Sequence, residues 1–233
     1  DETHAVKRPN PWSLLRTLHR LELRTLLGLG LAEAYQPLPA LDRAADHRDE
    51  STLERWRAIE QELGDFRGSA LDIGCNLGFF TLALAERGCL AVGVENERLV
   101  HRVCQLQAAI LDRSEATFIH GLLDLRLCRN LPRFDVTLFL SVFHHIVREQ
   151  GLEPATEIAR LLLDKTTKVL FFETGQSNET ESSWAHCLPA MEPDPRSWIT
   201  EFFLSLGARD VKVLGDFSTH VSPVDRSLFA IYP

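Results

Sequence analysis

The sequence LDIGCNLGFF occupies positions 71–80, and VGVEN follows at positions 92–96. The first stretch predicts a buried strand that ends in a glycine-containing turn and leads into a helix, and the second predicts another strand that ends at an acidic residue. Gly74 and Gly78 have no β-carbon, so the backbone of the turn can approach a ligand closely. Glu95 follows about 20 residues after the turn, where a carboxylate can bind both hydroxyls of a ribose. The pattern therefore predicts a site for a nucleoside cofactor.

The composition indicates one well-buried domain with an appendage. The chain has 233 residues, of which 45% are hydrophobic, too few for two full domains. Its formal net charge of −8 disfavours a nucleic-acid partner, because such binding depends on clustered Lys and Arg. No signal peptide is visible, and no apolar run approaches the roughly 20 residues that span a bilayer. We therefore expect a soluble, cytoplasmic protein without membrane insertion.

The cysteines and acidic residues do not predict a metal centre. The five cysteines are scattered without a C-x-x-C pair, and their odd number argues against a disulfide framework or a zinc site. Each is expected to be a small buried hydrophobic residue. Glu173 with Asp135 or Asp216 could supply oxygen ligands to a divalent cation such as magnesium, but no spacing identifies such a site, and we assign none.

The first 65 residues predict a helical cap. Trp12 and the following leucines recur at near-helical spacing, and the stretch from Tyr35 to Pro39 predicts a break. A second helix is expected over 51–63, with Ser51 as its N-cap and Glu54 completing a capping box.

Residues 66–233 form the second expected unit, in which predicted strands and helices alternate. Short apolar strands between helices imply a parallel sheet covered on both faces. The strands are expected at 70–73, 90–94, 116–119, 134–140 and 168–172, and helices at 77–87, 152–163 and 196–206. Only residues 215–225 join the last two strands, at 211–214 and 227–232. This connection is too short for a helical crossover, so these strands should pair antiparallel.

This order of elements resembles the class I S-adenosylmethionine-dependent methyltransferases from about residue 69 to 233. The fold class that the resemblance implies is α/β and Rossmann-like, with a seven-stranded, mostly parallel sheet containing one antiparallel strand. A dinucleotide-dependent dehydrogenase is the rival interpretation, but its G-x-G-x-x-G fingerprint requires a third glycine that this turn lacks. Asp72, before the turn, is the acidic residue that the methyltransferase motif has.

The resemblance implies S-adenosylmethionine as the cofactor. Asp72 would face the methionine ammonium, although it could instead complement the dipole of the following helix. At the adenine end, many relatives have an acidic residue directly after the glycine, whereas Gly121 is followed by two leucines. Asp124 either reaches over the adenine or is only a loop residue. The expected cofactor-binding residues are Asp72, Gly74, Cys75, Asn76, Gly78, Phe79, Glu95, Asn96, Leu123, Asp124 and Ser141.

The catalytic candidates follow strands that end at the expected ligand edge of the sheet. His144 and His145 lie in SVFHHI, and an imidazole with a pKa near 6.5 can accept a hydroxyl proton. One or both could instead only pack against the cofactor. Glu173 is the third candidate, as a base, an anchor for the acceptor or a metal ligand, and its alternative is to cap the next loop.

Two longer stretches carry a more specific resemblance. SVFHHIVREQGL at 141–152 and GDFSTHVSPVDR at 215–226 are similar to the methyltransferase half of the bifunctional kinase-methyltransferases that terminate bacterial O-antigen polysaccharides. This resemblance implies a carbohydrate acceptor. The residues expected to contact it are Arg48, Asp49, His220 and Arg226, with Arg55 and Trp56 covering it and Trp184 and Trp198 able to stack on a sugar ring. His220 and Arg226 could instead hold a rigid hairpin.

The predicted function is methylation of an oxygen at the end of an oligo- or polysaccharide. No kinase segment follows Pro233 in this sequence, so we favour a sugar hydroxyl over a sugar phosphate. The alternatives are a small-molecule or RNA methyltransferase, since CNLGFFT at 75–81 also resembles RNA 5′-phosphate methyltransferases, and a non-catalytic cofactor sensor. The sequence makes no prediction of the oligomeric state.

Overall fold

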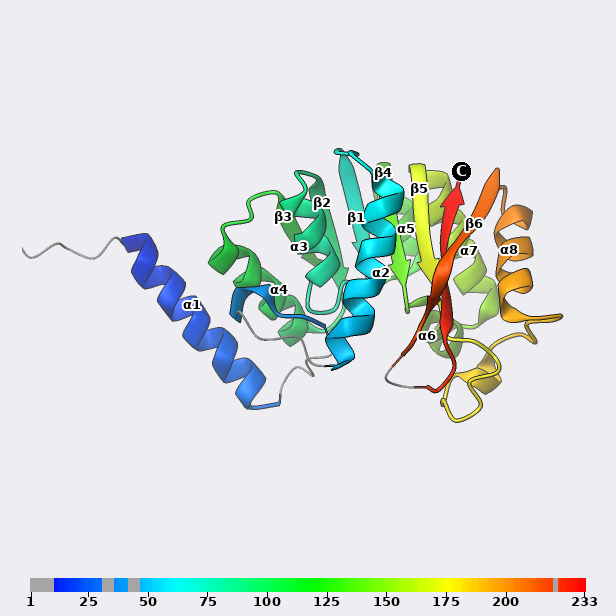
Figure 1. Ribbon diagram of the computed structural model, residues 1–233, viewed down its shortest axis with the longest axis horizontal. Helices are drawn as coiled ribbons and strands as arrows, with labels where there is room; N and C mark the ends of the chain where they lie inside the picture. The colour runs from blue at the N-terminus through cyan, green and yellow to red at the C-terminus, as the bar shows by residue number, and fades with distance from the viewer. Residues whose placement is uncertain (1–10, 31–35, 42–46, 220–221) are drawn as a thin grey trace, which may run out of the picture.

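The computed structural model describes residues 11–30, 36–41, 47–219 and 222–233 (Figure 1). These residues form a seven-stranded sheet with the strand order β3-β2-β1-β4-β5-β7-β6. The strands are β1 (Ser69–Ile73), β2 (Leu90–Glu95), β3 (Ala116–His120), β4 (Phe134–Leu140), β5 (Thr166–Glu173), β6 (Asp210–Phe217) and β7 (Arg226–Tyr232). β7 pairs antiparallel with both β5 and β6, whereas the pairs among β1 to β5 are parallel. The predicted fold class and its single antiparallel strand are therefore confirmed.

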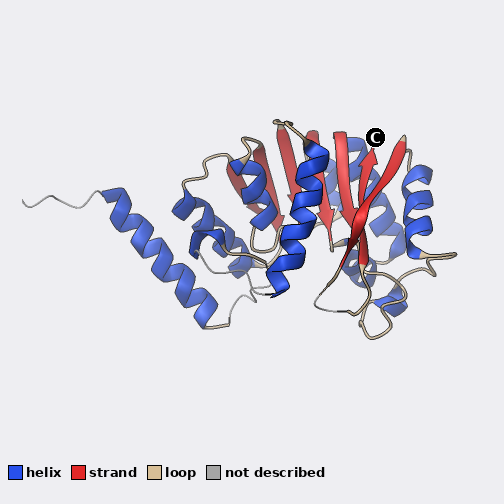
Figure 2. Cartoon of the chain, in the orientation of Figure 1, coloured by secondary structure: helices blue, strands red, loops and turns tan. Residues whose placement is uncertain are grey.

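Helices cover both faces of this sheet (Figure 2). They are α1 (Pro11–Gly28), α2 (His47–Leu63), α3 (Phe79–Glu86), α4 (Arg98–Leu111), α5 (Leu125–Asn130), α6 (Phe143–Gln150), α7 (Leu152–Lys165) and α8 (Pro195–Ser205), with short 3-10 helices at Pro39–Leu41 and Ala185–Cys187. Phe171 of β5 packs in the hydrophobic cluster of α2 and α3, and its neighbour Phe172 packs in that of α7 and α8. Successive residues of β5 thus face opposite layers, as expected for a strand buried on both sides.

The N-terminal helix α1 packs outside these layers, against α4 (Figure 1). Leu23 of α1 is fully buried against a cluster that includes Val103 and Ile110 of α4. Leu18 and Leu21, on the other side of α1, are 53% and 63% exposed. No helix in the described part of the chain is long and apolar enough to cross a membrane.

The predicted start of α2 is wrong. The helix begins at His47, and Ser51 is an interior residue whose hydroxyl donates a hydrogen bond to the backbone oxygen of Ser218. The four residues before Ser51 include no Gly or Pro, so nothing stops the helix from extending toward the N-terminus. As a result, Ser51 links α2 to the loop after β6 instead of capping the helix.

Four of the five cysteines are buried, as predicted, and Cys187 is only half-buried.

Candidate active site

The turn between β1 and α3 brings backbone to the carboxyl edge of the sheet. Gly74 has a φ of +66°, which side chains rarely adopt, and a β-carbon there would lie 2.5 Å from Cγ2 of Val142. Glycine is therefore required at this position. The turn that follows lines a cavity of about 590 Å³ beyond the ends of β1, β2 and β4.

Glu95 ends β2 and is held against the turn. Its carboxylate accepts hydrogen bonds from the backbone N–H of Asn76 at 2.9 Å and of Glu97 at 2.7 Å. The side chain is 8% exposed, and burial raises its pKa. Two backbone donors thus fix a carboxylate in the cavity wall, where it has acceptor sites left for a diol.

Asp72, near the end of β1, is the second carboxyl group in the wall. It is 3% exposed, and its Oδ2 accepts a hydrogen bond from the hydroxyl of Thr81 at 2.7 Å. Burial, with a contribution from the Glu95 charge, raises the pKa of Asp72 to about 7. A ligand ammonium beside Asp72 would favour the charged form and lower this pKa.

Twelve of the residues predicted from the sequence line this cavity. They come from the cofactor-binding, catalytic and acceptor-end predictions alike: Arg55, Asp72, Gly74, Asn76, Glu95, Asn96, Leu123, Ser141, His144, His145, Trp184 and Arg226. The side chains of Arg48 and Asp49, in the first turn of α2, lie outside the described part of the structure, as does His220.

Four predicted cofactor-binding residues do not line the cavity and have structural roles, three in packing and one as a helix cap. A β-carbon on Gly78 would lie 3.0 Å from the Phe118 ring, so its missing side chain makes room for β3. Cys75 and Phe79 are buried beneath the turn. Asp124 is the N-cap of α5, where its Oδ1 accepts a hydrogen bond from Leu127 N at 2.7 Å. Of the two interpretations of Asp124, the geometry favours the one without adenine contact.

The two histidines lie on the first turn of α6, in different surroundings. His144 is 1% exposed, and its Nδ1 accepts a hydrogen bond from the backbone N–H of Gly175 at 2.9 Å. Burial lowers its pKa well below the usual value, so the ring is neutral and carries its proton on Nε2. His145 is half-buried, and burial and the Arg148 charge lower its pKa. No hydrogen bond joins the His145 ring to another described residue, so it has a nitrogen free to accept a proton.

Trp184 stands beside both histidines. Its ring lies 4.7 Å from the His144 ring and 5.7 Å from the His145 ring, measured between centroids. The indole lines the cavity. It therefore places an aromatic surface beside His145, which is the histidine of this pair with no hydrogen bond to another described residue.

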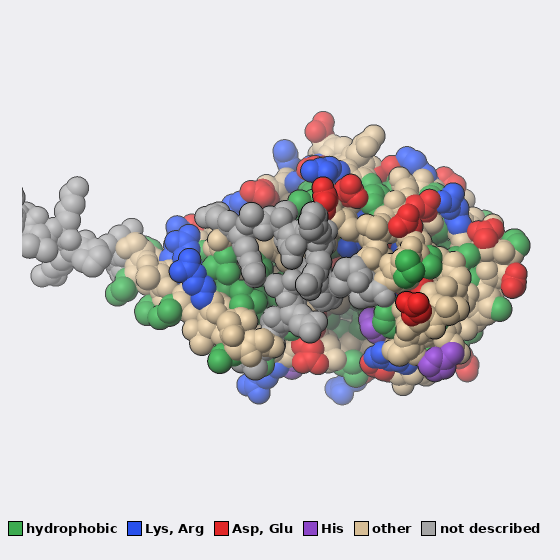
Figure 3. All heavy atoms as spheres, turned by 60° about the horizontal axis from the view of Figure 1, so that its bottom comes forward, with side chains coloured by type: hydrophobic (Ala, Val, Ile, Leu, Met, Phe, Trp, Pro, Cys, Tyr) green, Lys and Arg blue, Asp and Glu red, His purple; other side chains and the backbone are tan. Residues whose placement is uncertain are grey.

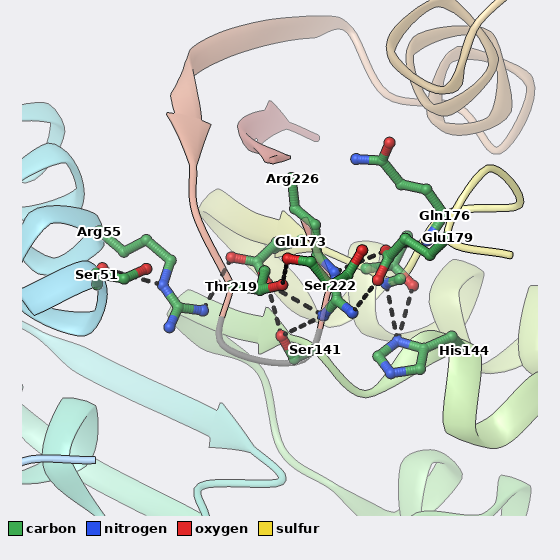
Figure 4. Close-up of polar contacts among 12 residues, drawn as sticks. Ser51, Arg55, Ser141, His144, Glu173, Gln176, Glu179, Thr219, Ser222 and Arg226 are labelled. Atoms are coloured by element: carbon green, nitrogen blue, oxygen red, sulfur yellow. Dashed lines mark hydrogen bonds and ion pairs between the residues drawn. The ribbon is translucent and has the colours of Figure 1, made fainter. Parts of the chain in front are cut away.

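Glu173 is fully buried at the end of β5 and does not line the cavity. Its Oε1 accepts a hydrogen bond from the hydroxyl of Ser141 at 2.6 Å, and its Oε2 accepts one from Nη1 of Arg55 at 3.0 Å (Figure 4). Ser141 has a φ of 57°, an uncommon value for a residue with a side chain. Glu173 therefore holds the end of β4 and ties α2 to the sheet, and the geometry does not support a direct role as base.

Arg226, the first residue of β7, is paired with Glu179. Its Nε and Nη2 donate to the two oxygens of Glu179 at 2.8 and 2.7 Å (Figure 4). Its Nη1 lies 3.4 Å from the Ser141 hydroxyl. The expected alternative was that Arg226 holds its own hairpin, but these contacts join it to Glu179 and Ser141, which lie outside the hairpin of β6 and β7.

Two acidic residues of this region were missed in the sequence. Glu149 lines the cavity and lies four residues after His145 on α6, so the helical period places both on one face and could have indicated it. Glu179 lies in the long segment after β5, which has no periodic pattern, and no sequence signal indicates its partner.

No group of three or more His, Cys, Asp or Glu within the described ranges could hold a metal ion. The two possible partners of Glu173 are engaged elsewhere. Asp135, near the start of β4, accepts a hydrogen bond from Ser69 N at 2.9 Å, and Asp216 forms an ion pair with Arg196.

The cavity wall fits the expected cofactor. It presents Asp72 for an ammonium group, Glu95 for a ribose diol, and apolar Leu122 and Leu123 for a base. The Oδ1 atom of Asn76 is buried and has no hydrogen-bond partner in the described structure, so it is an acceptor that a ligand could satisfy.

No family model matches the sequence. The chain is 30% identical over 220 residues to the O-antigen chain terminator bifunctional methyltransferase/kinase WbdD of Escherichia coli, and the match covers 90% of this chain and 29% of WbdD. The chain therefore spans less than a third of this curated relative. A crystal structure of WbdD superposes with a TM-score of 0.71 at 29% identity, covering 90% of this chain and 46% of that chain.

A structure of magnesium protoporphyrin IX methyltransferase (ChlM) from Synechocystis PCC 6803 with bound S-adenosylhomocysteine has a TM-score of 0.60 at 17% identity. This match covers 82% of this chain and 90% of that chain, and it shows the shared fold. The strand order, the glycine turn with its two carboxylates and these superpositions show that the chain has the fold of the class I S-adenosylmethionine-dependent methyltransferases.

Proposed function

We propose that this methyltransferase transfers a methyl group to a hydroxyl of a carbohydrate, at the end of an oligo- or polysaccharide. The observation that carries the proposal is the aromatic surface of Trp184 beside His145, in the cavity that also holds the cofactor-binding turn. An aromatic face suits the apolar face of a sugar ring, and an imidazole suits a hydroxyl proton. The similarity to WbdD, which is named as a chain terminator of O-antigen, supports the choice of carbohydrate.

The cofactor, S-adenosylmethionine, supplies a methyl group that is already activated on a sulfonium sulfur. Asp72 would hold the ammonium group of its methionine part, and Glu95 would accept hydrogen bonds from its ribose hydroxyls. Because the methyl group needs little further activation, the main work of the protein is to align the acceptor oxygen with it.

His145 is the proposed base. Its pKa is lowered by burial, so it is neutral near pH 7 and could accept the hydroxyl proton as the methyl group passes from sulfur to the acceptor oxygen, with S-adenosylhomocysteine as the leaving group. Nδ1 of His144 is already occupied by Gly175 N–H, so His144 can only donate from Nε2. His144 is therefore assigned to positioning the acceptor.

The charges around the cavity favour a hydroxyl over a phosphate. Among the described lining residues there is no lysine, and the two arginines are both in ion pairs, Arg55 with Glu173 and Arg226 with Glu179. Glu97 and Glu149 add acidic side chains to the same wall. An anionic acceptor would meet carboxylates without a free cation to balance it.

Within the N-terminal segment, α2 would cover the acceptor. Ser51 and Arg55 of α2 line the cavity together with Ser218 and Thr219 from the loop after β6. On the face shown in Figure 3, basic and acidic side chains are interspersed among the coloured residues, which suits a neutral acceptor better than RNA.

The test is incubation with isotope-labelled S-adenosylmethionine and a panel of neutral oligosaccharides, sugar phosphates and RNA, with mass spectrometry of the products. We expect label in a neutral glycan and its loss in the His145→Phe variant. Transfer to RNA or to a small phenol, with none to any glycan, would contradict the carbohydrate assignment. Transfer only to a sugar phosphate would contradict the hydroxyl assignment.

A further inference from the structure

Arg226 faces the cavity without a free charge. Its side chain is 4% exposed, and Glu179, whose side chain is fully buried, receives two of its hydrogen bonds. Glu179 is itself fixed, because its Oε1 also accepts a hydrogen bond from the backbone N–H of Gln176 at 2.7 Å. Its two oxygens therefore match the planar fork of the guanidinium, the same geometry by which an arginine binds a phosphate.

The remaining edge of Arg226 faces the acceptor end of the site. Nη1 lies 3.4 Å from the Ser141 hydroxyl and 3.9 Å from Oε1 of Glu173, and the guanidinium carbon lies 5.6 Å from the centroid of the Trp184 ring. The arginine is thus next to the surface on which the proposed sugar would stack. Without Glu179, Nε and Nη2 of Arg226 would be free to bind an anion, while Nη1 would keep its contacts with Ser141 and Glu173.

We propose that Glu179 sets the specificity of the site by neutralising Arg226, so that anionic acceptors such as sugar phosphates are excluded. That the excluded molecules are sugar phosphates rests on the proposed function. The neutralisation of Arg226 by Glu179 does not depend on it. A phosphate could reach the guanidinium fork only by displacing Glu179, and this would leave a buried carboxylate without its partner, which is strongly unfavourable. Glu179 acts through Arg226 and is therefore a positioning residue.

The test measures binding of inorganic phosphate by calorimetry, in the presence of S-adenosylhomocysteine and without any methyl transfer. Glu179→Gln keeps the size of the side chain and removes its charge. We expect this variant to bind phosphate at least about tenfold more tightly than the wild type, and Glu179→Asp to retain the wild-type exclusion in part. Glu181→Gln changes an exposed glutamate in the same segment and should bind phosphate no better than the wild type.

The result that overturns the proposal is phosphate binding by the wild type as tight as that by Glu179→Gln. A folded Glu179→Gln variant that binds no phosphate would overturn it as well. If Glu179→Gln does not fold, Glu179→Asp takes its place, and phosphate binding no tighter than the wild type by this variant overturns the proposal. Loss of the new binding in the double variant Glu179→Gln/Arg226→Gln would assign it to Arg226. Since no step requires methylation, failure of the carbohydrate assay would leave this result interpretable.

Discussion

Asp72 is the residue at which burial changes the chemistry most. It lies at the end of a strand with 3% exposure, and burial raises its pKa to about 7 from a usual value of 3.8. The folded protein therefore binds more protons than an unfolded chain between about pH 4 and pH 7. It follows that the contribution of Asp72 to stability is present at low pH and is lost as the pH rises through about 7.

The first prediction concerns Asp72→Asn in the absence of cofactor. The asparagine amide has an oxygen that can still accept the hydrogen bond from Thr81. Unlike the carboxyl group of Asp72, the amide cannot become charged. We expect the variant to melt at a higher temperature than the wild type at about pH 8, with the difference shrinking toward about pH 5. Thermal unfolding across this pH range measures it. A difference that does not change with pH would contradict the raised pKa.

The second prediction separates the two histidines. His145→Gln should lower turnover by about 10²- to 10⁴-fold, the usual contribution of a general base, while leaving the affinity for S-adenosylhomocysteine unchanged. His144→Gln should have a smaller effect on turnover, because Nδ1 of His144 is occupied by Gly175. Steady-state kinetics and calorimetry on both variants measure this. Near-normal turnover in both would show that neither histidine is the base.

At the scale of elements, two contacts fix how helices meet the site. α2 is joined to the end of β5 by the ion pair between Arg55 and Glu173. α5 begins at Asp124, whose side chain caps it. The first contact is a buried ion pair and the second is a local helix cap. Removing the ion pair should therefore lower the free energy of unfolding more than removing the cap.

The third prediction is that Arg55→Met destabilises the fold strongly. It would leave the buried Glu173 with only the longer contact to Arg226, at 3.9 Å, and the loss of a buried ion-pair partner costs up to about 3–5 kcal/mol. The control is Arg57→Met, on the exposed side of the same helix, which should change the free energy of unfolding by less than about 0.5 kcal/mol. Urea unfolding measures both. Restoration of most of the lost stability by adding Glu173→Gln would tie the effect to this pair.

The fourth prediction tests the role of Asp124. Asp124→Ala should lower the free energy of unfolding by about 1 kcal/mol, the usual cost of losing an N-cap. Asp124→Asn should stay near the wild type, because asparagine caps helices equally well. Neither should weaken cofactor binding if the residue only caps α5. A loss of S-adenosylhomocysteine affinity in both variants would instead support contact with adenine.

At the scale of the whole molecule, the core extends to the last strand of the chain. β7 lies between β5 and β6, and Phe229 at its centre is fully buried in the cluster of α7 and α8. In contrast, α1 contacts α4 with one side and exposes leucines on the other. The C-terminal strand is therefore part of the cooperative fold, whereas the outer face of α1 contributes little to it.

The fifth prediction follows from this difference. Phe229→Ala should destabilise the protein by about 3–5 kcal/mol, because it opens a cavity at the centre of the sheet. Leu21→Ala, at a position that is 63% exposed, should change stability by less than about 0.5 kcal/mol. Chemical unfolding followed by circular dichroism measures both. Equal losses would mean that the outer face of α1 is covered in solution.

The sequence by itself determined the alternation of strands and helices, the glycine turn and its two carboxylates. It also determined the antiparallel last pair, because the connection over 215–225 is too short for any other arrangement. These features depend on residues close together in the chain, where periodicity and turn chemistry act. The start of α2 escaped prediction because a capping pattern at Ser51 competes with residues before it that can also be helical.

Only the tertiary structure decided the roles of the charged residues at the acceptor end. Glu179 and Arg226 are 47 positions apart, and Glu173 and Arg55 are 118 apart. The tautomer of His144 likewise depends on Gly175, which follows a different strand. Such pairs carry no local pattern, because folding brings together side chains whose spacing in the sequence is unrelated to their contact. The turn thus identified the cofactor class, whereas the pairing of distant charges became visible only in the folded chain.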